Sequence, residues 1–149
     1  MNIIKSLVVI ITLLLIKGES HAAKIQITTA DELNTTLKQR DDSKKVLFFF
    51  TSWCPYCKTA IEQVVSNQFQ DKVVFISLDK NYLQLSAFSP SLPDTVIIYY
   101  LSNQSEIMSF FDSYGIRYRG SIPYISVLDE DSELLKDDVS LRQLQRYLK

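Results

Sequence analysis

The chain contains two cysteines, Cys54 and Cys57, and they lie three positions apart. Cysteines at this spacing can open and close a disulfide, exchanging two electrons with a partner thiol or disulfide. The thiolate is the attacking form, so the cysteine whose thiolate is better stabilised acts as the nucleophile. The pair therefore predicts redox chemistry carried by the protein's own sulfur atoms, without a small-molecule cofactor.

The two cysteines lie where a strand is expected to turn into a helix. The apolar run at 46–50 predicts a buried strand, and the pattern of residues 59–68 predicts an amphipathic helix. Free N–H groups and the helix dipole favour an anion at the first helical turn, so we expect a lowered pKa for Cys54. Pro55 suits that turn, because its missing N–H costs nothing there. We expect Cys54 to be partly exposed and to attack, and Cys57 to be buried and to resolve the mixed disulfide.

Two other roles for the pair are less well supported. A structural disulfide closing so short a loop would contribute only about 2 kcal/mol by the chain-entropy estimate. A zinc site needs further ligands, and the chain has no other cysteine. Redox chemistry is therefore the favoured hypothesis, and no metal site is predicted.

Residues 1–22 have the pattern of a secretory signal peptide. Lys5 supplies a positive start, and residues 6–16 form an apolar segment too short to span a bilayer comfortably. Small residues in Ser20-His21-Ala22 favour cleavage after Ala22; an uncleaved anchor is the alternative. We expect residues 23–149 to form one exported domain without a membrane span, periplasmic if the source is bacterial and otherwise in the secretory pathway.

The composition argues against several other functions. A formal net charge of −1 gives no reason to expect nucleic acid or an anionic membrane surface as a partner. The single histidine, His21, would leave with the signal peptide, which removes Cys-His and Ser-His-Asp catalysis from the mature protein. Activation of Cys54 would then depend on the helix, the backbone and a lysine.

The segment Phe50-Thr51-Ser52-Trp53-Cys54-Pro55-Tyr56-Cys57-Lys58 resembles the active site of the thioredoxin superfamily. Trp before the first cysteine and Lys after the second are typical of that family, and the Pro-Tyr dipeptide occurs in glutaredoxins and in periplasmic disulfide proteins. The resemblance implies an α/β, thioredoxin-like fold with a mixed central β-sheet flanked by helices. It also implies thiol–disulfide oxidoreductase activity, with Trp53, Pro55 and Tyr56 contacting the substrate.

A second segment, 114–129, resembles the part of thioredoxin that carries a cis-proline, here Pro123. In the family the residue before this proline pairs its backbone with the bound substrate and faces the cysteines, which implies that role for Ile122. The alternative is an ordinary trans proline at the start of a strand. Tyr118 and Arg119 lengthen the preceding loop relative to thioredoxin.

The chain departs from thioredoxin at three places. Phe48 stands where thioredoxin has a buried acid that helps to deprotonate the second cysteine, and Asp137 and Asp138 replace a typical glycine near the last strand–helix junction. Between Leu83 and Phe111 the chain adds a strand and a helix before the cis-proline segment. This insertion is similar to that of the larger periplasmic thioredoxin-like proteins, a branch that includes the reductases of cytochrome c maturation.

The remaining elements follow from periodicity and capping residues. Strands are predicted at 23–28, 73–79, 95–101 and 133–136. Helices are predicted at 29–39 with a capping box of Thr29 and Glu32, at 80–88, from Ser105 to a final Gly115, and after Ser140 with Leu141, Leu144 and Leu148 on one face.

These features predict an enzyme that exchanges thiols and disulfides on exported proteins and is recycled by a redox partner protein. An exported location favours an oxidant in general. The hydrophobic Ile122 resembles the reductases instead, which makes a reductase or isomerase the preferred hypothesis over a strong oxidase. A non-catalytic partner-binding or chaperone module with the same fold is the rival hypothesis, and glutaredoxin-like glutathione chemistry is a third.

Overall fold

The computed structural model describes residues 21–149, so most of the predicted signal peptide, 1–22, lies outside the described residues. Six strands form one mixed sheet in the order β1-β4-β3-β2-β5-β6. They are β1 (Lys24–Thr28), β2 (Lys44–Phe50), β3 (Val73–Ser77), β4 (Ile97–Leu101), β5 (Tyr124–Asp129) and β6 (Leu134–Lys136). The predicted α/β class and the mixed central sheet are confirmed.

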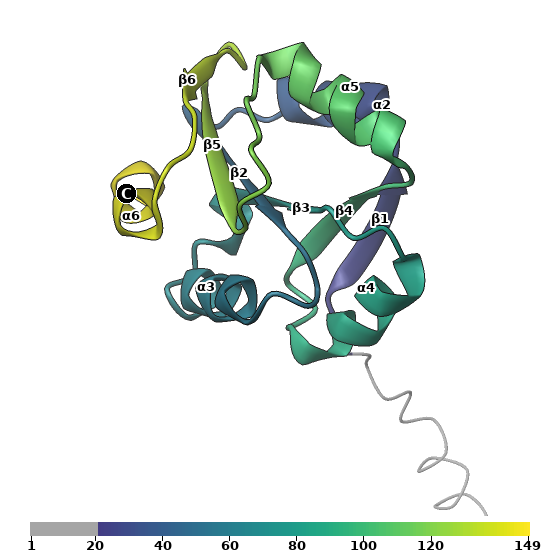
Figure 1. Ribbon diagram of the computed structural model, residues 1–149. Helices are drawn as coiled ribbons and strands as arrows, with labels where there is room; N and C mark the ends of the chain where they lie inside the picture. The colour runs from purple at the N-terminus through teal and green to yellow at the C-terminus, as the bar shows by residue number, and fades with distance from the viewer. Residues whose placement is uncertain (1–20) are drawn as a thin grey trace, which may run out of the picture.

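Helices cover both faces of the sheet (Figure 1). One face carries α2 (Ala30–Lys38) and α5 (Gln104–Tyr114); the other carries α3 (Pro55–Ser66), α4 (Tyr82–Phe88) and α6 (Leu141–Leu148). Successive side chains of β2 alternate between the two cores, with Phe48 and Phe50 on the α3 side and Leu47 and Phe49 on the α5 side. All four are fully buried, which explains why the run is continuously apolar rather than alternating.

The predicted strand–helix insertion is present, and its strand, β4, lies between the edge strand β1 and β3. β4 pairs in parallel with β1 through Lys24↔Ile97 and with β3 through Phe75↔Ile98. β2 pairs in parallel with β3 and antiparallel with β5. The carboxyl ends of β2, β3 and β4 therefore meet at one edge of the sheet, which is where open α/β sheets carry their ligand sites.

The helix caps agree with the sequence except at α5. Thr29 and Glu32 form the predicted capping box of α2, Ser140 caps α6, and Gly115 ends α5 in the left-handed region at φ +67°. The predicted N-cap Ser105 was wrong. The cap is Asn103, because its Oδ1 accepts the Glu106 amide at 3.0 Å and the helix already begins at Gln104.

The predicted buried face of α6 is only partly correct. Leu144 and Leu148 are buried in the core, whereas Leu141 is 40% exposed. Leu141 occupies the first position of the helix, where the chain has only begun to lie against the sheet.

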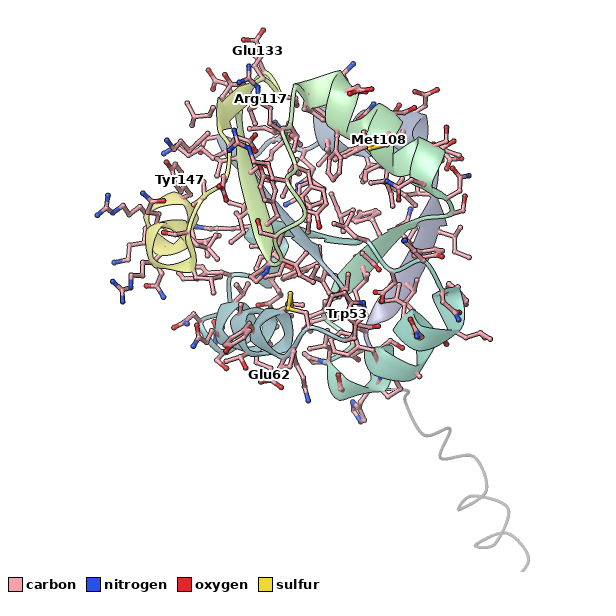
Figure 2. The ribbon with its side chains drawn as sticks, in the orientation of Figure 1. Trp53, Glu62, Met108, Arg117, Glu133 and Tyr147 are labelled. Carbon is pink, nitrogen blue, oxygen red and sulfur yellow. A yellow bond between two sulfur atoms is a disulfide. The ribbon has the colours of Figure 1, made fainter. Side chains whose placement is uncertain are left out.

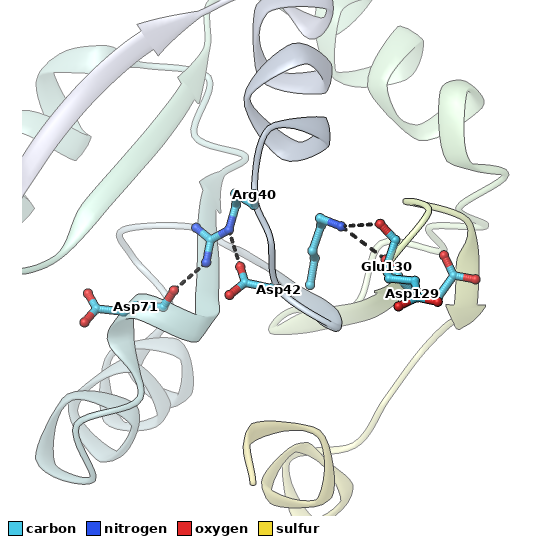
Figure 3. A network of polar contacts seen from close by, with 6 residues as sticks. Arg40, Asp42, Asp71, Asp129 and Glu130 are labelled. Carbon is cyan, nitrogen blue, oxygen red and sulfur yellow. Dashed lines mark hydrogen bonds and ion pairs between the residues drawn. The ribbon is translucent and has the colours of Figure 1, made fainter.

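A network of polar contacts lies at the amino end of β2, opposite the end that leads to the cysteines (Figure 3). The Lys45 side chain is fully buried, and its Nζ donates to the carbonyls of Asp129 at 3.3 Å and Glu130 at 2.9 Å. Nearby, Arg40 pairs with Asp42 at 2.6 Å and donates to the carbonyl of Asp71. A buried ammonium needs such acceptors, so these contacts explain how a lysine is accommodated in a central strand.

Candidate active site

The two cysteines form a disulfide at the amino end of α3 (Figure 2). Pro55 is the first residue of this helix and Cys54 is its N-cap, as the sequence predicted. The Cys54 Sγ accepts the Cys57 amide at 3.1 Å, and the two Cα atoms lie 5.3 Å apart. A backbone donor aimed at Sγ, together with the helix dipole, stabilises negative charge on this sulfur once the disulfide opens.

The two sulfurs differ in exposure less than expected. Cys57 is fully buried, as predicted, but the prediction that Cys54 is partly exposed was wrong, because only 5% of this residue is accessible. Its Sγ is bonded to the Cys57 sulfur and turned toward the helix amide, which removes it from solvent. Cys54 is still the more accessible residue of the pair.

Asp79 fixes the loop that leads to Cys54. Its buried carboxylate accepts the Ser52 amide at 2.9 Å, the Ser52 hydroxyl at 2.7 Å and the Ser77 hydroxyl at 2.8 Å. The Cys54 amide in turn donates to the Thr51 carbonyl at 3.2 Å. The turn between β2 and α3 is thus connected to the end of β3 by charge-assisted hydrogen bonds, which are stronger than neutral ones.

The surroundings of Cys57 are apolar. Phe48, Phe75 and Ile61 belong to the same core cluster as both cysteines, and the Phe48 and Phe75 rings meet edge to face at 5.7 Å. Position 48, which the resemblance matches to the buried acid of thioredoxin, holds an aromatic ring packed on a second ring. Phe48 has no group that could take a proton from Cys57.

The other predicted substrate residues surround the redox pair. Trp53 and Tyr56 are 67% and 77% exposed, and Pro55 is also exposed. The Ile122–Pro123 peptide bond is cis, the form that the resemblance implied. Ile122 packs against the core cluster that contains both cysteines. Trp53 and Ile122 therefore lie together in space, whereas Pro55 and Tyr56 are exposed at the first turn of α3.

Beside the redox pair lies a cavity of about 440 Å³. Trp53 and Ile122 line it at the redox pair, and the ends of two parallel strands contribute Thr51 and Lys80. Further lining side chains that the sequence analysis did not assign to a site are Gln84, Gln104, Ile107, Phe111 and Tyr118. The one sequence signal for Thr51 and Lys80 was their position just beyond predicted strands.

The loop that carries Arg117 and Tyr118 is fastened to β5 and to the segment after β6. The Arg117 amide donates to Asp137 at 2.9 Å, and its carbonyl accepts the Tyr124 hydroxyl at 3.2 Å. The Tyr118 ring packs on Phe111 and on Tyr124, both at 5.3 Å. The lengthened loop thus supplies a wall of the cavity.

Asp137 is ionised more readily than an ordinary aspartate. Burial works to raise its pKa, but the Arg117 amide, the Ser126 hydroxyl and other donors outweigh burial, and the pKa lies below its usual range. Burial and the neighbouring Asp137 carboxylate raise the pKa of Tyr124. Tyr124 is therefore a neutral hydrogen-bond donor at physiological pH.

The described part of the chain contains no group of three or more His, Cys, Asp or Glu side chains arranged to hold a metal ion. Between residues 21 and 149, no helix combines the length and the apolar character needed to cross a bilayer.

Comparison with known proteins places the chain among redox proteins. The redoxin family profile matches residues 17–140. The rice protein "Probable nucleoredoxin 3" (Oryza sativa subsp. japonica) is 25% identical over 120 residues, a match that covers 75% of this chain but only 24% of the rice protein. This chain therefore corresponds to about a quarter of that curated relative.

Solved structures show the same fold. A conserved protein of unknown function from Bacteroides fragilis superposes with a TM-score of 0.58 at 20% identity, covering 76% of this chain and 85% of that one. A thioredoxin-like protein from Bacteroides caccae gives 0.56 at 20% identity, covering 75% and 42%. A protein assigned as thiol:disulfide interchange protein DsbE from Chlorobium tepidum gives 0.53 at 18% identity, covering 77% and 85%. The predicted thioredoxin-like fold is confirmed.

Proposed function

Because the chain belongs to the redoxin family, we propose that it is a protein thiol–disulfide oxidoreductase that acts on exported proteins, mainly as a reductase or isomerase. The observation that carries the proposal is the Cys54–Cys57 disulfide at the N-terminus of α3, with the Cys57 amide aimed at the Cys54 sulfur. A structural disulfide would need neither this placement nor an adjoining cavity.

In the reductive direction, the Cys54 thiolate attacks one sulfur of a substrate disulfide. The substrate S–S bond breaks, its second sulfur leaves as a thiolate and takes a proton from water, and a mixed disulfide with Cys54 remains. Cys57 then loses its proton and attacks the Cys54 sulfur, which releases the second substrate thiol and restores the Cys54–Cys57 disulfide. Two electrons have passed to the substrate, and a dithiol partner protein must supply two more for the next cycle.

Substrate binding is assigned to the residues around the pair. Trp53, Pro55 and Tyr56 expose apolar surface at the amino end of α3, and Ile122 with Pro123 offers backbone polar groups to an extended substrate. A hydrophobic residue before the proline supports the reductive assignment, since the resemblance connects it with reductases. The apolar cluster below Cys57 is consistent with an enzyme whose sulfurs alone carry the redox change.

The test is a trapping experiment with Cys57→Ser. This variant keeps the first attack and blocks release, so partner proteins should accumulate as adducts on Cys54 that a reductant dissolves. The double variant that also carries Cys54→Ser is the matched control and should collect none. If Cys57→Ser collects no partner although the wild type is folded and oxidisable, the non-catalytic docking module is the better hypothesis.

The direction of electron flow has its own measurement. A reduction potential near −270 mV, roughly that of thioredoxin, supports the reductase, whereas one near −120 mV identifies an oxidant.

Export is tested by determining the N-terminus of the protein made in its source cell, which should begin at Ala23. Ala23 is also where the described fold starts, since its amide donates to the carbonyls of Ser89 and Leu92, both at 3.1 Å.

A further inference from the structure

The cavity beside the redox pair has walls of two kinds. Three apolar residues line the cavity, Leu78, Ile107 and Phe111. The lining also includes three residues with polar side chains, Lys80, Gln84 and Gln104. The cavity continues past Lys80 and Gln104 into a second hollow of about 460 Å³ at the first turn of α5. α4 and α5 lie on opposite faces of the sheet (Figure 1). Because Gln84 of α4 and Gln104 of α5 both line the cavity, the two hollows together form a groove across the carboxyl end of β3.

Lys80 gives the cavity its charge. It is the one charged side chain among the described residues that line the 440 Å³ cavity, and it is exposed. The ion pairs found between residues 21 and 149 join Arg40 to Asp42 and Lys58 to Glu62, which leaves Lys80 without an acidic partner in this part of the chain.

Two carboxylates lie close in sequence to lining residues, Asp79 next to Lys80 and Glu106 two residues after Gln104. Both accept hydrogen bonds from other groups. Asp79 accepts hydrogen bonds from Ser52 and Ser77, and the Oε2 atom of Glu106 accepts the Ala30 amide at 2.6 Å. Neither forms an ion pair with Lys80, since the ion pairs between residues 21 and 149 involve other residues.

Thr51 belongs to the cavity wall through atoms other than its hydroxyl oxygen. It lines the cavity and is 94% buried, its exposed fraction being 6%, yet its Oγ1 has no hydrogen-bond partner among the described residues. Because the Oγ1 atom itself is buried, it is not exposed to the cavity and does not count among the groups that an incoming ligand would meet. The donors that remain are Lys80 and the side-chain amides of Gln84 and Gln104, a set suited to a negatively charged acceptor.

We infer that this cavity receives a carboxylate carried by the substrate close to its reacting sulfur, and that Lys80 selects for it. The inference rests on the proposed function, because the exchange with Cys54 is what places the substrate sulfur beside Trp53 and Ile122. The methylene groups of the incoming side chain pack on Ile107 and Phe111 while the carboxylate meets Lys80. The carboxylate belongs either to an Asp or Glu residue next to a cysteine of a polypeptide, or to a small carboxylate-rich disulfide such as glutathione disulfide.

The experiment measures single-turnover oxidation of the reduced protein by synthetic peptide disulfides. Each peptide carries one cysteine linked to a neutral fluorescent thiol, and the peptides differ only in one residue, Glu, Gln or Lys, placed one or two positions from that cysteine. The wild type should react about five- to tenfold faster with the Glu peptide than with the Lys peptide at low salt. The difference should shrink as the salt concentration rises.

Variants of Lys80 separate charge recognition from folding. Lys80→Gln should remove the preference, Lys80→Glu should reverse it, and Lys80→Arg should keep it. Lys136→Gln is the matched control, because Lys136 is an exposed lysine of β6 at the far edge of the sheet and should leave the preference unchanged. If the wild type exchanges disulfides but reacts equally fast with the Glu, Gln and Lys peptides, whether the variable residue is one or two positions from the cysteine, the carboxylate site is overturned. The proposed function would not be affected by that result.

Two further arms complete the design. Faster reaction with glutathione disulfide than with the Glu peptide, lost in Lys80→Gln, would identify the small molecule as the source of the carboxylate. Failure of the wild type to react with every peptide and with neutral 2,2′-dithiodipyridine would overturn the proposed function itself. The two failures are therefore distinguishable.

Discussion

The amide and the hydroxyl of Ser52 both donate to the buried carboxylate of Asp79, at 2.9 and 2.7 Å. These bonds join two residues that are 27 positions apart in the sequence, one just before the redox helix and one just after β3. They hold the turn that presents Trp53 and Cys54. Asp79 is therefore a positioning residue for the redox pair.

Asp79→Asn should weaken this turn. Hydrogen bonds to a charged group contribute about 1.5–3 kcal/mol each, so we expect a loss of about 2 kcal/mol in the free energy of unfolding. Ser52→Ala, which keeps the amide bond, should lose about 1 kcal/mol. Urea unfolding measures both, and single-turnover exchange at equal folded fraction should be slowed several-fold in Asp79→Asn.

Asp131→Asn is the control for this substitution, because Asp131 is an exposed aspartate outside the site. A loss of stability in Asp79→Asn no larger than in Asp131→Asn would mean that the carboxylate does not hold the turn.

The two cysteines should differ in reactivity once the disulfide is reduced. Cys54 lies at the N-terminus of α3, receives the Cys57 amide and is the more accessible of the two, whereas Cys57 is fully buried. We expect iodoacetamide to modify Cys54 at least about tenfold faster than Cys57 at neutral pH, since the thiolate is the reacting form. Mass spectrometry of the labelled peptides measures the two rates. In guanidinium chloride the rates should become similar, and a faster Cys57 in the folded protein would reverse the assigned roles.

Asp137 should make stability depend on pH in the acid range. Its pKa is lower in the folded protein than in the unfolded chain, so its contribution is fully present above the unfolded pKa, roughly pH 4, and is lost as the pH falls through the folded pKa. In Asp137→Asn this part of the pH dependence should be absent. Urea unfolding of both proteins between pH 2 and 7 tests this, with the exposed Asp41→Asn as control. A constant difference in stability across the whole range would contradict the expectation.

Asp138 occupies the left-handed region at φ +54°, where glycine is the favoured residue. Asp138→Gly should therefore be neutral or stabilising by up to about 1 kcal/mol, and Asp138→Val should cost about 1–2 kcal/mol. The Asp138 backbone amide donates to the Asp137 carboxylate at 3.2 Å, and this hydrogen bond is available to each variant. Thermal unfolding distinguishes them, and Asp131→Gly, at a position without positive φ, should bring no gain. Equal stability of the Gly and Val variants would show that backbone strain is not decisive here.

The redox centre could be predicted from the sequence because its signals are local. The apolar run of β2, the N-cap position of Cys54 and the proline at the first turn of α3 all lie within about a dozen residues, and each has a short-range physical cause. The capping box of Thr29 and Glu32 was likewise recognisable from residues three apart.

The cavity could not be predicted, because it depends on the order of strands in the sheet. Thr51, Lys80 and Gln104 follow three different strands, and they meet only because β4 lies next to β3 and β3 next to β2. The mistaken cap at Ser105 has a local cause, since Asn103 and Ser105 are both good capping residues. The positive φ of Asp138 could not be predicted, because glycine is the usual sequence signal for this conformation and the junction has none.

The ring of Phe48 has a consequence for proton coupling. Reducing the disulfide adds two electrons and, while both thiols stay protonated, two protons, so the potential should fall by about 59 mV for each unit of pH. Once Cys54 has ionised, only one proton accompanies the two electrons, and the slope should halve to about 30 mV. A carboxyl group at position 48 could gain or lose a proton during reduction and make this change in slope less sharp. The Phe48 and Phe75 rings have no group that does so. In this protein the slope of the reduction potential against pH should therefore depend on the two cysteines alone. The pH at which the slope changes should be the pKa of Cys54 in the reduced protein.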